Sequence, residues 1–171
     1  MAFEMSYDAR EIANFYLDHA DSRGMQMTIM SLLKVIYFAH GWHLARYGKP
    51  LVKNRFEAWQ HGPVVRAVYE SFKEVGKSPI RERATRFDPL TATHSAVNYE
   101  FTPEEGSFLR EIFDAYGHLH AFRLSDLTHE PGSPWDHLWN ETSGLTHPGM
   151  RISDESIRNH FMRRHHLQAE H

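Results

Sequence analysis

Apolar and polar positions recur along much of the chain with the 3.6-residue period of α-helices, and capping residues mark where several of these stretches begin. Asp8, followed three residues later by Glu11, forms a capping-box pattern that predicts a first helix ending near Gly24. Residues 29–47 are apolar on nearly every side of a predicted second helix. We therefore expect this second helix at the centre of the molecule.

The second half of the chain repeats these signals. Thr102 and Glu105 form another capping box around a first-turn proline, and an apolar stripe follows as far as Gly117. Ser133 and Ser153 are suitable N-caps for later helices. Three further helices are therefore predicted over residues 122–128, 133–139 and 153–166.

The stretches between these helices are less regular. Residues 51–60 predict one strand or extended segment, and Pro63 is placed to start a third helix with an apolar stripe from Val64 to Val75. Residues 77–98 indicate a loop with short elements at most. Together the patterns predict a mainly α, single compact domain of five to seven helices with a small β element, which becomes α+β if the strands pair.

Charge and composition narrow the classes of partner. With 22 acidic and 19 basic residues the net charge is -3, so the chain lacks the basic surface that nucleic acids attract. The predicted helix after Ser153 is basic enough to suggest DNA, but a solvated helix end is the simpler interpretation. No apolar run is long enough to span a membrane or direct secretion, so we expect neither a membrane partner nor a nucleic-acid partner.

The histidine and cysteine content affects which kinds of metal site and catalytic site are possible. The chain has no cysteine, which excludes disulfides and thiolate chemistry, but it has 14 histidines. His40 and His43 lie three residues apart on the predicted second helix, so a metal-dependent enzyme with a His-rich site is the alternative function. The sequence has no H-E-x-x-H motif, and His40 as a hydrogen-bonded core residue is the simpler interpretation. We expect no metal and no other cofactor.

Motifs for other enzyme classes are missing from the sequence. It lacks the G-x-S-x-G pattern of hydrolases and a glycine loop that would hold phosphates. We therefore predict no catalytic residue and no enzyme activity.

Two segments combine tryptophan, histidine and rigid turns in a way that core packing alone does not explain. They are residues 57–63, read as an extended segment that meets a helix N-terminus, and residues 124–135. Rigid turns suit a recognition surface because they lose little entropy on binding. The alternative is that both tryptophans fill the core and the glycine and proline residues only start helices. The candidate contact residues are Trp59, His61, Gly62, Pro63, Asp126, Thr128, His129, Pro134 and Trp135.

Three strings carry a family resemblance when they are taken together and in order. They are LKVIYFAHGW from Leu33, EAWQHGPVV from Glu57 with the VY and FK pairs that follow, and residues 124–135. The sequence resembles the Panacea domain, the SocA-like family of antitoxins also described as phage-associated proteins. The resemblance covers residues 7–139 of a single domain spanning 1–171, and residues 140–171 are expected to form a helical extension packed on it.

The resemblance implies a function by binding. A Panacea-like protein is expected to be a cytoplasmic antitoxin that neutralises a cognate toxin, encoded beside it, through direct protein contact. A SocA-type member also delivers its toxin to a protease, so a protease is the second partner that the resemblance implies. The family has no assigned catalytic residue and no obligatory cofactor.

Overall fold

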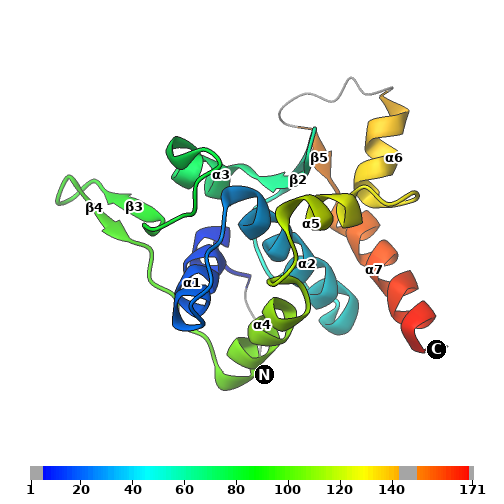
Figure 1. Cartoon of the computed structure of the whole chain (residues 1–171), viewed down its shortest axis with the longest axis horizontal. Helices are drawn as coiled ribbons and strands as arrows, with labels where there is room; N and C mark the ends of the chain where they lie inside the picture. The colour runs from blue at the N-terminus through cyan, green and yellow to red at the C-terminus, as the bar shows by residue number, and fades with distance from the viewer. Residues whose placement is uncertain (1–5, 143–149, 170–171) are drawn as a thin grey trace.

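Helix α2 (Ile29–Tyr47) runs through the middle of the molecule, as its sequence predicts (Figure 1). Thr28 caps it through a capping box with Ser31, and helices α1, α3, α4, α5 and α7 all pack against it. Its buried residues come from every side of the helix because it is enclosed in this way. The central position predicted for residues 29–47 is confirmed.

The computed structural model describes residues 6–142 and 150–169, with side chains as far as Arg164. Within these ranges it contains seven α-helices and a few short strands, which confirms the predicted mainly α class. The remaining helices are α1 (Ala9–Ser22), α3 (Arg66–Phe72), α4 (Pro103–Tyr116), α5 (Ala121–Thr128), α6 (Pro134–Glu141) and α7 (Asp154–Ala169). A short 3-10 turn, η1 (Lys73–Val75), follows α3.

The predicted caps set most of these helix boundaries. Asp8 with Glu11 and Thr102 with Glu105 form complete capping boxes at α1 and α4. Ser133 accepts a hydrogen bond from the backbone of Asp136 at the start of α6. Each cap satisfies backbone N–H groups that the first helical turn leaves without partners. Glycine and proline in the sequence predict a turn at 144–149, which lies outside the described residues.

A small antiparallel sheet lies beside the helices. Strands β1 (Phe56–Trp59), β2 (Gly62–Val65) and β5 (Arg151–Ile152) form it in the order β2-β1-β5. The prediction that Pro63 starts a helix is wrong, because Pro63 lies in β2 opposite Ala58 and helix α3 begins only at Arg66. An edge strand can hold a proline because one side of the strand needs no ladder donor.

A second hairpin occupies the stretch expected to be mostly loop. Strands β3 (Thr85–Asp88) and β4 (Thr93–Ala96) pair with each other and extend away from the helices (Figure 1). Their side chains are almost all exposed, so the alternation of buried and exposed residues that marks a strand in a sequence is missing.

Helix α7 packs more extensively on α2 than any other element does. The ring of Phe161 lies so close to Gly41 that a Cβ there would be 2.2 Å from the ring. At the start of α7, Asp154 lies 2.9 Å from Nε2 of the fully buried His40. Helix α7 is therefore held against the central helix α2 through Asp154 at its start and through Phe161 further along. Among the described residues, no helix is both long and apolar enough to span a membrane.

Candidate functional site

The turn between β1 and β2 rests on the segment that carries α5 and α6. Ser125 Oγ donates a hydrogen bond to the carbonyl oxygen of His61 over 2.8 Å. Trp135 Nε1 donates to the carbonyl oxygen of Trp59 over 2.6 Å. The two segments singled out in the sequence therefore meet, and side chains of one hold the backbone of the other.

Gly62 allows this close approach. Its φ of +115° is a conformation that side chains strongly disfavour, and a Cβ there would lie 2.6 Å from Thr128 Oγ1. Thr128 itself is buried and donates to the carbonyl of Ser125. The turn and α5 thus fit together only because residue 62 has no side chain.

Lys34 of α2 lies beneath the same turn. Its side chain is 1% exposed, and its Nζ donates to the carbonyl oxygen of Pro63 over 2.9 Å. Burial lowers the pKa of Lys34 to about 7, because an ammonium group loses its hydration there. Sequence analysis missed this residue, and the only available signal was a lysine within an otherwise apolar helix.

His129 completes the underside of the site. Its ring packs on Trp135 with centroids 3.9 Å apart. Burial lowers the pKa of His129, and the positive charge of Lys34 lowers it further. Its Nε2 is buried and has no hydrogen-bond partner among the described residues, which also disfavours protonation there.

Trp59 is partly buried and is held on its side of the turn by neighbours from β1 and α3. Its Nε1 donates to Glu57 over 2.7 Å, and Glu57 also forms an ion pair with Arg66 at 3.0 Å. The Arg66 guanidinium lies 5.5 Å from the indole centroid, and Tyr69 contacts the indole edge-on. The indole thus keeps one orientation without being fully covered.

The nine candidate residues divide sharply by exposure. His61 and Asp126 are exposed, and Trp59 and His129 are partly buried. Trp135 is only 8% exposed, so of the two alternatives for the tryptophans it fills the core. The other four shape the site from within and are buried: Gly62, Pro63, Thr128 and Pro134.

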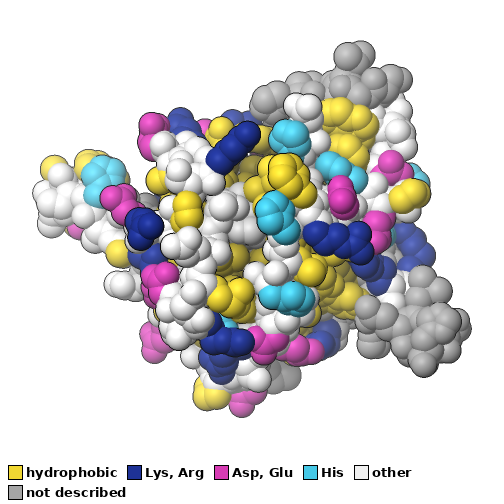
Figure 2. Space-filling model, viewed as in Figure 1, with side chains coloured by type: hydrophobic (Ala, Val, Ile, Leu, Met, Phe, Trp, Pro, Cys, Tyr) yellow, Lys and Arg dark blue, Asp and Glu magenta, His cyan; other side chains and the backbone are white. Residues whose placement is uncertain are grey.

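Phe122 is the exposed residue that sequence analysis missed. Its side chain is 71% exposed, on the same stripe of α5 as Asp126 and His129, since these positions are four and seven residues further along. It stacks on His120 at the start of the helix. Figure 2 shows histidine and hydrophobic side chains gathered over α5. We name the contact surface as Trp59, His61, Phe122, Asp126 and His129.

The histidines considered for a metal have other roles in the structure. His40 Nδ1 accepts a hydrogen bond from the Val52 N–H, which leaves the proton on Nε2 to bond Asp154. His43 Nδ1 donates to the carbonyl oxygen of Lys49. In the described part of the chain, no three His, Asp or Glu side chains converge in a way that could hold a metal ion. Nothing in this geometry favours the alternative of a metal-dependent enzyme.

A cavity of about 480 Å³ opens between α2 and α4, away from these residues. Trp42, Ile112 and Tyr116 form its apolar walls, and the ion pair between Arg46 and Glu111 lies at its side. None of the candidate contact residues lines it.

Comparison with known proteins places this chain in a family. The family model described as antitoxin SocA-like, Panacea domain, matches residues 32–136. The chain is also 35% identical over 156 residues to Antitoxin SocA from Caulobacter vibrioides (strain NA1000 / CB15N), covering 91% of this chain and 83% of that protein. The chain belongs to the SocA-like Panacea family. No solved structure matches it.

The range matched by the SocA-like family model contains every residue of the contact surface. It begins at Leu32 in α2 and ends at Asp136 in α6, so it also contains Lys34 and Trp135. Helices α1 and α7 lie outside this range and pack on α2, which lies almost wholly within it.

Proposed function

We propose that this SocA-like chain is a cytoplasmic antitoxin, without enzyme activity, that neutralises a cognate protein toxin by binding it directly through the contact surface. The observation that carries the proposal is the meeting of residues 57–63 and 124–135 in one surface. The relative named Antitoxin SocA supports the same role. No observation favours a protease as a second partner, and the proposal does not include one.

The contact surface has the properties of a binding site that is preorganised before a partner binds. Phe122 supplies an exposed apolar anchor, and His61 and Asp126 add polar groups beside it. The partly buried hydrogen bonds from Ser125 and Trp135 hold the turn, so little conformational entropy is lost when a partner docks. Aromatic anchors in such settings carry a large share of the binding free energy.

Co-expression tests this proposal. We expect the reading frame beside this one to stop growth when it is expressed alone, and wild-type protein to restore growth. Phe122→Ser should fail to restore it, because the anchor is lost. Tyr47→Ser is the matched control, since Tyr47 is an aromatic residue 41% exposed at the opposite end of α2 from Lys34. It should restore growth.

Two outcomes would contradict the proposal. If the neighbouring reading frame is not toxic, or its toxicity persists with wild-type protein, the chain is not its antitoxin. If Phe122→Ser and His61→Ala both accumulate as folded proteins and still restore growth, the toxin binds a different surface.

A further inference from the structure

The β3–β4 hairpin forms an arm, residues 84–97, that projects from the helical body (Figure 1). Two large apolar side chains on it are exposed, Phe87 at 52% and Leu90 at 94%. An isolated two-stranded hairpin is marginally stable in water. Something must therefore hold the arm in place, and something must account for its exposed apolar side chains.

Asn14 of α1 holds the base of the arm. Its Oδ1 accepts a hydrogen bond from the Ala84 N–H over 2.8 Å, and its Nδ2 donates to the carbonyl oxygens of Val97 and Ala84 over 2.9 and 3.0 Å. The Val97 N–H donates to the Ala84 carbonyl over 2.9 Å. The buried carboxamide thus takes the place of one backbone rung and fixes both strands to α1.

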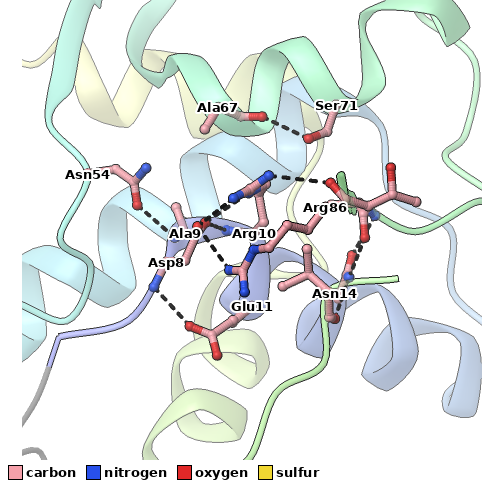
Figure 3. A network of polar contacts seen from close by, with 12 residues as sticks. Asp8, Ala9, Arg10, Glu11, Asn14, Asn54, Ala67, Ser71 and Arg86 are labelled. Atoms are coloured by element: carbon pink, nitrogen blue, oxygen red, sulfur yellow. Dashed lines mark hydrogen bonds and ion pairs between the residues drawn. The ribbon is translucent and has the colours of Figure 1, made fainter. Parts of the chain in front are cut away.

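Charged residues then set which face of the arm turns toward the body. Figure 3 shows Arg86 pointing back toward Asp8, at a distance of 3.4 Å, and Arg10 lies 3.3 Å from the Thr85 carbonyl. Because side chains alternate along a strand, the residues on the opposite face turn away from the body. That outer face carries no acidic or basic side chain except a histidine: Thr85, Phe87, His94 and Ala96.

The arm has two unpaired edges, and the edge of β4 is the less protected one. Val97 donates its backbone N–H to the Ala84 carbonyl, and hydrogen-bonded and non-hydrogen-bonded pairs alternate along an antiparallel ladder. The N–H and C=O groups of His94 and Ala96 therefore point away from β3. Arg10 covers the start of the β3 edge, whereas β4 has no proline, lysine, arginine or acidic residue. Proteins normally protect such an edge with charge or proline, because it can pair with another strand.

We propose that the β4 edge binds an extended segment of the toxin by strand addition, with side chains of that segment lying beside His94 and Ala96 on the outer face. Strand addition supplies main-chain hydrogen bonds, and alternate side chains supply selectivity. The proposal rests on the proposed function, because it adds a second contact to the same partner. The arm and α5 are both visible from the side of the molecule drawn in Figures 1 and 2, the arm at the left edge and α5 near the centre.

The size of the edge favours the toxin over a second copy of this chain. A four-residue strand buries far less than the roughly 1,200 Å² that a stable pair of proteins needs. A toxin already bound at the contact surface needs only a small additional binding free energy at the arm, because its effective concentration there is high.

Two lysine variants on one strand test the proposal. Purified wild-type protein is titrated with the protein encoded by the neighbouring reading frame, in a calorimeter. Ala96→Lys places a charge on the outer face and should raise the dissociation constant about tenfold, the equivalent of one to two lost hydrogen bonds. Thr93→Lys, equally exposed but on the inner face, should change it less than about threefold.

Hydrogen exchange on the wild-type complex gives an answer that does not depend on any variant folding. The amides of His94 and Ala96 should gain protection together with those of α5. Protection at α5 without protection at β4 would overturn the arm's role and leave the proposed function standing. A complex that never forms would overturn both. Light scattering that shows a dimer of this chain alone, lost in Ala96→Lys, would assign the edge to a second copy instead.

Discussion

At the scale of single residues, Lys34 and Gly62 determine how the β1–β2 turn fits onto α2 and α5. Lys34 gives its hydrogen bond to the Pro63 carbonyl, and Gly62 leaves the space that Thr128 occupies. The sequence predicts a turn with glycine and proline here, but it does not show that a lysine 29 positions earlier lies beneath it. Phe122 was missed for a similar reason, because helical spacing does not reveal which face of a short helix remains uncovered.

The lowered pKa of Lys34 makes stability depend on pH. The unfolded chain binds the lysine proton up to about pH 10, whereas the folded protein releases it near a pKa of about 7. The unfolded state therefore binds more protons above pH 7, and stability rises with pH. We expect the free energy of unfolding of wild type to rise relative to that of Lys34→Met by about 2 kcal/mol between pH 7 and 9. Urea denaturation at several pH values measures this, and parallel curves for the two proteins would contradict it.

At the scale of elements, local signals account for the helices, and tertiary contacts account for the strands. The capping boxes at Asp8 and Thr102 are correct because a cap and its partner lie three residues apart. The sequence predicts a helix at Pro63 because local signals do not reveal that this residue pairs with Ala58 in β2. The arm could not be predicted because its stability comes from Asn14, about 70 residues away in the sequence.

Removal of the Asn14 carboxamide tests the arm as an element. Asn14→Ala leaves the Ala84 N–H and the Val97 carbonyl without partners in a buried place, which should lower the free energy of unfolding by about 2–3 kcal/mol. Hydrogen exchange should speed up selectively in residues 84–97. Asn98→Ala, an exposed asparagine beside the arm, is the control and should match wild type. A loss below about 0.5 kcal/mol in Asn14→Ala would show that other contacts hold the arm.

At the scale of the whole molecule, the contact surface depends on segments that only the fold brings together. The resemblance indicates the family from short strings, and the candidate residues from those strings include both the exposed His61 and the buried Trp135. The structure separates the residues that a partner can reach from those that support them. Helix α7, fixed through His40 and Phe161, covers another side of α2 and leaves the turn and α5 open to a partner.

Direct binding between purified proteins tests the central claim, that this chain neutralises a toxin through the contact surface. In a calorimeter, the protein encoded by the neighbouring reading frame should bind wild type, and Phe122→Ser should weaken binding at least about thirtyfold, as expected for an aromatic anchor worth about 2 kcal/mol. Tyr47→Ser should bind as wild type does. Absence of binding, or wild-type affinity in a folded Phe122→Ser protein, would contradict the claim.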